Sequence, residues 1–148
     1  MALTPADPGF EARVRDSFAR QRVMATLGAR LVRVAPGEVD LELPFRADLT
    51  QQHGYLHAGI VTTLLDSACG YAAFSLMPAD ATVLSVEFKT NLLAPAAGER
   101  LLARGRVLRA GRTLTVCEAS GVMLDGGGEK AVAHMVGTMM ALAGKQDR

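Results

Sequence analysis

The sequence predicts an α+β fold in which a long antiparallel sheet wraps around one central buried helix, with an additional helix at the N-terminus. The residues from Ile60 to Leu76 are apolar or small on every side, with Asp66 as the only charge, which is typical of a buried helix. Long strand-like runs follow and are separated by short turns, which favour antiparallel pairing. A helix that is apolar all round needs cover on every side, and a curved sheet supplies most of that cover.

The first element is expected to be an amphipathic helix over about residues 8–27. Asp7 and Pro8 are typical of a helix start, and Gly28 is typical of a helix end. Between them, apolar residues recur at four-residue spacing, at Phe10, Val14 and Phe18. This spacing predicts one helix with one apolar face.

Two short strand candidates, 31–34 and 39–43, are separated by the turn residues Ala35-Pro36-Gly37, and together they predict a hairpin. The central helix is expected over about residues 57–76. After it, apolar and polar residues alternate over 82–89, which predicts a half-buried strand. Three further strands joined by tight turns are expected, and the last of them ends at about residue 142: 101–108, 113–124 and 130–142.

Length and composition limit the class of protein. The 148 residues suit one compact domain, so 1–148 is expected to form a single unit. Sixteen basic and fifteen acidic residues give a formal net charge of +1, which argues against a nucleic-acid partner. The hydrophobic share of 49% is high for a small monomer and indicates apolar surface covered by another subunit.

The expected location is the cytoplasm. No apolar run reaches the roughly 18 to 20 residues of a membrane span, and the N-terminus lacks the pattern of a signal peptide. We therefore expect no membrane partner. Cys69 and Cys117 are isolated in the sequence, which favours two reduced core residues over a disulfide or a metal motif.

Asp66 is the first functional candidate. An ionised carboxylate buried without partners is costly, so the chain must give Asp66 hydrogen-bond partners, a shifted pKa or a catalytic role. The alternative is a carboxylate that Thr62, Thr63 or backbone donors satisfy, with no part in catalysis. The residues that precede Asp66 favour the catalytic role.

Those residues form a spaced motif of Gln51, the tripeptide 57–59 (His-Ala-Gly) and Asp66. With it the chain resembles the hotdog-fold thioesterases, and within them the PaaI-like branch, which hydrolyses acyl-CoA thioesters. In that family an Asn or Gln is followed six residues later by His-Gly-Gly, and an Asp or Glu lies nine residues after the His. The turns 95–99 and 111–113 also look like family features. Ala58 departs from the pattern at the first Gly, although it supplies the same backbone N–H.

The chemistry requires a base or nucleophile and a donor for the carbonyl oxygen as it becomes an oxyanion. The backbone N–H groups of Ala58 or Gly59, at a helix start, suit the second role. Asp66 lies farther along the same helix by roughly 12 Å, at 1.5 Å per residue, too far to reach the same carbonyl. The resemblance implies a homodimer, assembling further to a tetramer, in which Gln51 and the Ala58 amide of one chain face Asp66 of the other. Asp66 then acts as general base or as nucleophile, and the sequence leaves both open.

The same resemblance implies further site residues. Ser85 matches a position whose hydroxyl holds the attacking water, with an ordinary polar strand residue as the alternative. Gln51 can instead close its own loop, and Gln52 offers a register one residue away. His57 matches a helix-entry residue that ties down the loop beside the substrate. A zinc site built from His57 and His53 lacks a third ligand, and neither a metal nor a cofactor is expected.

Substrate contacts are expected from tyrosine and arginine side chains. Coenzyme A carries a 3′-phosphate and a pyrophosphate, so cations near the pocket mouth are expected, and Arg109 and Arg112 are the candidates. Their alternative fate is a solvated sheet face. Tyr55 is expected to border the acyl pocket, together with four other residues: Leu56, Tyr71, Phe74 and Met77.

The predicted function is therefore hydrolysis of an acyl-CoA thioester to the free acid and CoA. One alternative is a non-catalytic acyl-CoA or acyl-carrier sensor on the same fold, in which Asp66 only orients the ligand. A hydratase is a second alternative, which the spacing from His57 to Asp66 disfavours.

Overall fold

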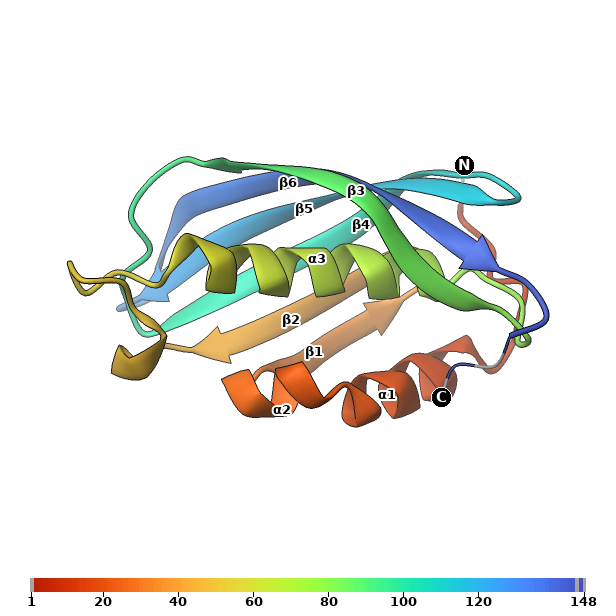
Figure 1. The fold of residues 1–148 in the computed structure, drawn as a ribbon, viewed down its shortest axis with the longest axis horizontal. Coiled ribbons are helices and arrows are strands. Elements are labelled where there is room, and N and C mark those ends of the chain that lie inside the picture. Colours follow the sequence, from red (N-terminus) through yellow and green to blue (C-terminus); the bar gives the residue numbers. More distant parts are fainter. Residues whose placement is uncertain (1, 146, 148) are drawn as a thin grey trace.

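The computed structural model describes residues 2–145 and residue 147. Six strands form one antiparallel sheet in the order β1-β2-β4-β5-β6-β3. The elements follow one another along the chain as α1 (Phe10–Arg20), α2 (Arg22–Leu27), β1 (Arg30–Ala35), β2 (Glu38–Pro44), a 3₁₀ turn (Ala47–Leu49), α3 (Ala58–Phe74), β3 (Thr82–Leu92), β4 (Arg100–Ala110), β5 (Leu114–Asp125) and β6 (Gly128–Leu142). Figure 1 shows α3 lying along the concave side of this sheet.

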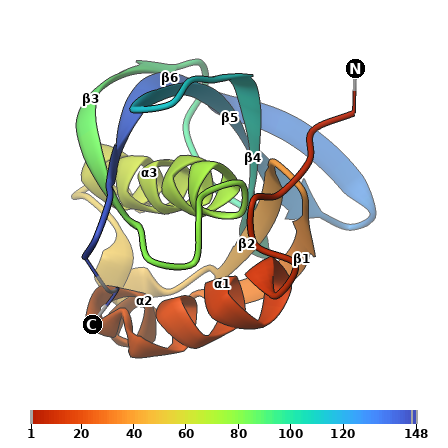
Figure 2. The same cartoon turned by 90° about the vertical axis from the view of Figure 1, so that its right-hand side faces the viewer.

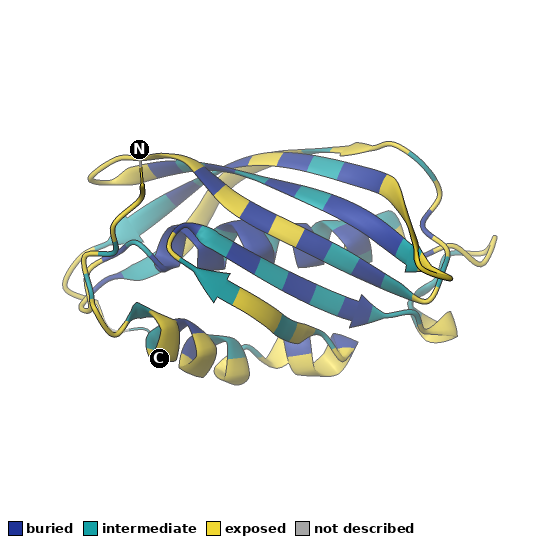
Figure 3. Ribbon diagram, turned by 180° about the vertical axis from the view of Figure 1, so that it is seen from behind, coloured by how far each residue is buried: buried dark blue, intermediate teal, exposed yellow. Residues whose placement is uncertain are grey.

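The sheet curves around α3, which confirms the predicted α+β fold (Figure 2). Leu64, Leu65 and Ala68 of α3 are fully buried, as expected for a helix that is covered by a sheet. Gly105 lets the backbone of β4 pack closely against the backbone of α3, since a Cβ at this position would lie 2.4 Å from the carbonyl oxygen of Ala68. The two-residue periodicity holds along β2 and β4, where buried and more exposed residues alternate (Figure 3).

The N-terminal helix is the first correction. Instead of one helix over 8–27, the structure has α1 and α2 with a break at Gln21, whose backbone is extended at φ −77° and ψ 98°. Val14 and Leu27 are both buried, yet at about 100° per residue a straight helix would place them about 140° apart. The break lets both side chains face the core. Gly28 ends α2 in the left-handed conformation, as predicted.

Strand β3 is the second correction. It follows α3 in the sequence and precedes β4, but it pairs with β6 and forms one edge of the sheet, so the turn after it joins strands that are not neighbours. The predicted half-buried alternation is also wrong, because Leu84, Val86 and Phe88 are each more than 40% exposed. A bulge between Ser85 and Glu87 interrupts the two-residue period of this strand.

The other elements match the prediction closely. The hairpin of β1 and β2 is confirmed, and a second hairpin joins β5 to β6 through Gly126 and Gly127, both with positive φ. Cys69 and Cys117 are buried and unpaired, as expected. Within the part of the chain that the structure describes, no helix is long and apolar enough to cross a bilayer.

Candidate active site

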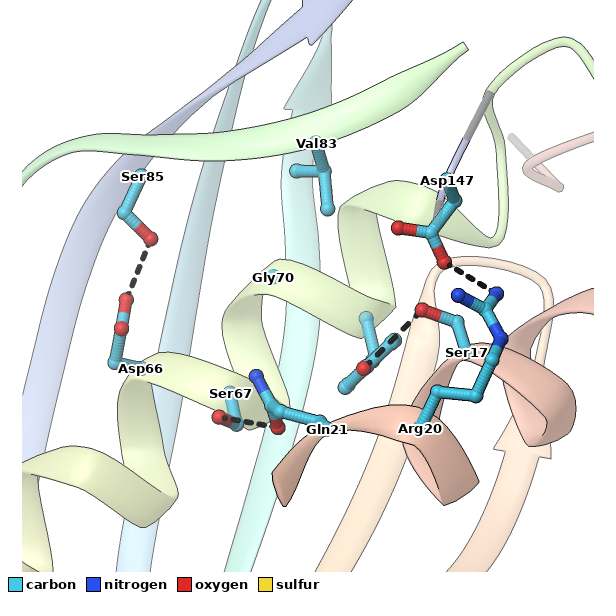
Figure 4. Close-up of a pocket in the computed structure, with 10 residues that line it drawn as sticks. Ser17, Arg20, Gln21, Asp66, Ser67, Gly70, Val83, Ser85 and Asp147 are labelled. Carbon is cyan, nitrogen blue, oxygen red and sulfur yellow. Dashed lines mark hydrogen bonds and ion pairs between the residues drawn. The ribbon is translucent and has the colours of Figure 1, made fainter. Parts of the chain in front are cut away.

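Asp66 lies on α3 and faces β3. Its Oδ1 accepts a hydrogen bond of 2.7 Å from the hydroxyl of Ser85 (Figure 4). The alternative in which threonines satisfy the carboxylate finds no support, since Thr63 donates instead to the carbonyl oxygen of Gly59 at 2.8 Å. Among the described residues, Ser85 is the side chain that hydrogen-bonds Asp66.

Burial raises the pKa of the Asp66 carboxyl above its usual value, and the hydrogen bond from Ser85 lowers the pKa in part. No cation contributes to this balance. The carboxylate of Asp66 is therefore a stronger base than an exposed aspartate, which is the property that proton abstraction from water requires.

The start of α3 presents one unoccupied backbone donor. His57 caps the helix, because its Nδ1 accepts a hydrogen bond of 2.8 Å from the N–H of Gly59. The Gly59 amide is thus already engaged, whereas the Ala58 amide donates to no acceptor within the described residues. Of the two amides that the sequence offered, that of Ala58 is the one available to an oxyanion.

Gln51 closes the loop that precedes α3. Its side-chain oxygen accepts a hydrogen bond from the N–H of His53, and its own N–H donates to the carbonyl oxygen of Tyr55 at 2.9 Å. The loop-closing role considered for Gln51 is therefore present. Gln51, Tyr55 and Ala58 also line a common groove of about 400 Å³, whose other wall is the segment from Leu92 to Ala96.

Asp66 and Ser85 line a different hollow, a cavity of about 230 Å³ that runs along α3 from Asp66 to Tyr71. Its lining residues come from α1, the break at Gln21, α3, β3 and the C-terminal segment: Ser17, Arg20, Gln21, Asp66, Ser67, Gly70, Tyr71, Val83, Ser85 and Asp147. One chain therefore brings Asp66 together with Ser85, and Gln51 together with Tyr55 and Ala58. It does not bring the two groups together.

The remaining predicted contacts lie elsewhere. Arg109 is at the end of β4 and Arg112 in the turn before β5, and both are exposed and line neither hollow. The five-residue acyl pocket expected from the sequence is not a single pocket. Phe74 and Met77 are core residues, and Tyr71 lines the Asp66 cavity rather than the groove of Tyr55.

One wall of the Asp66 cavity, formed by α1 and the residue after it, was not predicted from the sequence. Ser17, Arg20 and Gln21 form this wall, and their spacing of three and four residues places them on one face of a helix. That polar face was the available signal. What the sequence did not indicate is that this face lies against α3 next to Asp66.

The comparisons with known proteins agree with this fold. The family model of the thioesterase superfamily matches residues 53–129. A thioesterase family protein from Silicibacter pomeroyi has a crystal structure that is similar at a TM-score of 0.90, with 60% identity over 92% of this chain and 100% of that chain. The protein named "Putative esterase VNG_1336C" from Halobacterium salinarum is 34% identical over 103 residues, 66% of this chain and 68% of the relative.

A more distant structure shows the same architecture. The E. coli PaaI protein, from the phenylacetic acid degradation operon, is similar at a TM-score of 0.83 over 95% of this chain and 99% of that chain. Its identity of 19% supports a shared fold. Since the family model covers more than half of the sequence and the sheet wraps a central helix as the resemblance implied, the chain belongs to the thioesterase superfamily and has the hotdog fold.

Proposed function

We propose that this protein hydrolyses acyl-CoA thioesters to the free acid and CoA. The proposal rests on one observation: Asp66 lies on the buried helix, burial raises the pKa of its carboxyl, and Ser85 donates a hydrogen bond to it. Membership of the thioesterase superfamily supports hydrolysis of a thioester, and the relatives from Silicibacter pomeroyi and Halobacterium salinarum are described as a thioesterase family protein and a putative esterase.

Asp66 supplies the reactive carboxylate in this mechanism. As a general base it takes a proton from water, whose oxygen attacks the thioester carbonyl carbon; as a nucleophile its own oxygen attacks and an anhydride forms. In the first route the proton taken by Asp66 passes to the CoA sulfur as the C–S bond breaks and the free acid forms. In the second route the CoA thiolate leaves as the anhydride forms and takes a proton from solvent, and water then hydrolyses the anhydride to the free acid and Asp66. Ser85 orients the carboxylate, and its hydroxyl oxygen lies where it can also accept a hydrogen bond from water.

The Ala58 amide stabilises the negative charge on the carbonyl oxygen. It has no acceptor within the described chain and it lies at the positive end of the α3 dipole, so it is preorganised for an oxyanion. A donor of this kind contributes about 3 kcal/mol to lowering the barrier. Gln51 stands beside it in the same groove, where its side-chain amide can bind the carbonyl oxygen.

The complete site requires two chains. Ala58 and Asp66 line different hollows of one chain, about 12 Å apart along α3, so one carbonyl cannot meet both. Edge strand β3 offers the contact surface, since its open side exposes the apolar residues Val86, Phe88 and Leu92. We propose a homodimer through β3 that places Gln51 and Ala58 of one chain against Asp66 and Ser85 of the other, with two dimers forming a tetramer.

The nucleotide end of CoA then lies outside the two hollows. Arg109 and Arg112 are exposed and have no ion-pair partner among the described residues, which leaves them open to phosphate groups. Tyr55, which is 39% exposed at the groove, and His57 at the helix start contact the pantetheine end in this proposal. Residues 1–148 act as one catalytic domain, and the buried free cysteines fit a reducing cytoplasm.

The test follows thiol release and ligand binding side by side. The purified protein is incubated with acyl-CoAs of two to eight carbons, free thiol is measured by a colorimetric reagent, and binding is measured by calorimetry. Turnover supports the proposal. Binding without any thiol release would overturn it and leave the non-catalytic acyl-CoA or acyl-carrier sensor as the function of the fold.

A further inference from the structure

The Asp66 cavity extends along α3 to a polar end, which the hydrolytic chemistry does not use (Figure 4). Asp66 and Ser85 lie at one end, and Tyr71 lies five residues farther along the helix, about 7.5 Å at 1.5 Å per residue. Gly70 lies between them, and a Cβ built there would meet no atom within 4 Å. The path from the carboxylate to Tyr71 is therefore open.

Gln21 has hydrogen-bonding capacity to spare at this end. Its extended backbone, at the break between α1 and α2, places the side chain beside Ser67, whose hydroxyl donates to Gln21 Oε1 at 3.3 Å. The side-chain nitrogen of Gln21 donates no hydrogen bond within the described residues. An acceptor atom in the cavity can therefore bind it.

Tyr71 offers a second polar group. Its hydroxyl lies 3.3 Å from Ser17 Oγ, and a single hydrogen bond joins the two. Either hydroxyl can be the donor in that bond, and when Ser17 donates, the proton of Tyr71 is free to bind an acceptor in the cavity. Burial raises the pKa of Tyr71, so its hydroxyl stays protonated at neutral pH.

The charges at the cavity select against an ionised ligand end. Arg20 is the cation of the lining, and it already pairs with Asp16 and Asp147 at 3.0 Å each. Asp66 and Asp147 contribute two carboxylates, so a ligand carboxylate would meet repulsion and no free partner. A neutral oxygen can accept hydrogen bonds from the side-chain nitrogen of Gln21 and the hydroxyl of Tyr71 without this electrostatic repulsion.

We infer that the cavity binds the acyl group and selects short acyl groups whose far end carries a neutral oxygen, a hydroxyl or a carbonyl. Gln21 and Tyr71 are the residues that determine this specificity. At about 230 Å³ the cavity is smaller than pockets for drug-sized ligands, which suits an acyl group alone and not a long chain. The inference rests on the proposed function, because it assigns the acyl end of the same site.

The test compares hexanoyl-CoA with 6-hydroxyhexanoyl-CoA, which differ by one terminal oxygen. A site built to hydrogen-bond a hydroxyl rejects the analogue that lacks it. We expect kcat/KM to be at least about tenfold higher for the hydroxylated ester, with most of the difference in KM, because the contact lies away from the reacting carbonyl.

Two variants locate the preference. Gln21→Met keeps the side-chain length and removes the donor, and Tyr71→Phe keeps the ring and removes the hydroxyl. Each is expected to lower the ratio of the two kcat/KM values to about threefold or less. Arg22→Met is the matched control, because Arg22 is the exposed neighbour of Gln21 and lines no part of the cavity. The ratio in this control should equal that of the wild type.

The possible results distinguish a failure of this inference from a failure of the proposed function. If the wild type hydrolyses both esters equally well, or if Gln21→Met and Tyr71→Phe leave the ratio unchanged, the inference is overturned and the proposed function stands. If the wild type releases no thiol from either ester, the proposed function is decided separately by thiol release from the panel of two to eight carbons. The cavity is then tested by the ratio of the two Kd values from calorimetry, and equal Kd values overturn the inference as well.

Discussion

The hydroxyl of Ser85 donates to Oδ1 of Asp66 across 2.7 Å, joining edge strand β3 to the central helix. The two residues are 19 positions apart, and Ser85 is the last residue before the bulge in β3. Ser85 Oγ also lies 3.3 Å from the sulfur of Met139 on the neighbouring strand. The strand therefore fixes the direction of the carboxylate, and a substitution of Ser85 should change the pKa of Asp66.

Ser85→Ala should move the acid limb of the pH profile. The Ser85 hydrogen bond stabilises the ionised carboxylate and lowers the pKa of Asp66 in part, against the rise caused by burial. Without the bond the pKa of Asp66 rises further, so kcat/KM should begin to fall at a higher pH than in the wild type. The measurement is kcat/KM between pH 4 and 8. Ser85→Thr, which keeps a hydroxyl, should restore the wild-type limb, and an unshifted limb in Ser85→Ala would contradict the coupling.

Asp66→Asn should stabilise the protein at neutral pH. Burial raises the pKa of Asp66 above its value in the unfolded chain, so the folded state binds this proton more tightly. The stability linked to that proton is present at acid pH and is lost as the pH rises through the folded pKa. Asp66→Asn should therefore raise the Tm at pH 7 and raise it less at pH 4. Asp80→Asn, at an exposed position, is the control; a lower Tm for Asp66→Asn at pH 7 would speak against a buried ionised carboxylate.

Mixed dimers test the proposal that each site uses two chains. Gln51→Ala and Asp66→Asn should each be nearly inactive alone. When they are unfolded together and refolded, half of the dimers contain one chain of each kind and one intact site, so about one quarter of wild-type activity should return. The measurement is thiol release per mole of protein after refolding.

The control for this experiment pairs two changes in the same half of the site. Ser85 and Asp66 are hydrogen-bonded within one chain, so mixing Ser85→Ala with Asp66→Asn should give no more activity than the two proteins measured separately. If Gln51→Ala and Asp66→Asn also fail to complement each other, the site lies within one chain and the dimeric site is wrong.

Two glycines test the packing of the sheet on α3. A Cβ on Gly105 would lie 2.4 Å from a backbone oxygen of α3, so Gly105→Ala should cost about 1–3 kcal/mol of unfolding free energy. Gly70 is within α3 and has open space, so Gly70→Ala should add about 0.5–1 kcal/mol through helix propensity. Denaturant unfolding measures both. Equal effects of the two changes would contradict the close contact at Gly105.

Much of the fold could be predicted because its signals are local. The run after His57 has one charge among apolar residues, and the turns at Gly37 and at Gly126 contain residues suited to positive φ. The break at Gln21 has no such local signal, because the residues around it continue a helical pattern. The bend is required by the packing of both helices on the core. The exposure of Val86 likewise depends on strand order, which local alternation does not encode.

The site was predictable to the same degree. Asp66 and Ser85, which the motif and the resemblance indicate as candidates, lie in contact. The engagement of Gly59 by His57 depends on a side-chain rotamer, and the polar cavity wall from Gln21 depends on how α1 packs on α3. Neither can be derived from residue spacing. The cavity wall follows from tertiary contacts between segments far apart in the chain, whereas the bond between His57 and Gly59 is local.

Thiol release by the wild type and by Asp66→Ala is the most direct test of Asp66 as the catalytic carboxylate. Both proteins are assayed on the same panel of acyl-CoAs at neutral pH, with Asp80→Ala as a control at an exposed aspartate. Turnover should fall by about 100-fold or more in Asp66→Ala and stay at the wild-type rate in Asp80→Ala, since a positioned acid or base contributes about 10² to 10⁴. Equal turnover by the wild type and Asp66→Ala would contradict a catalytic role for this carboxylate.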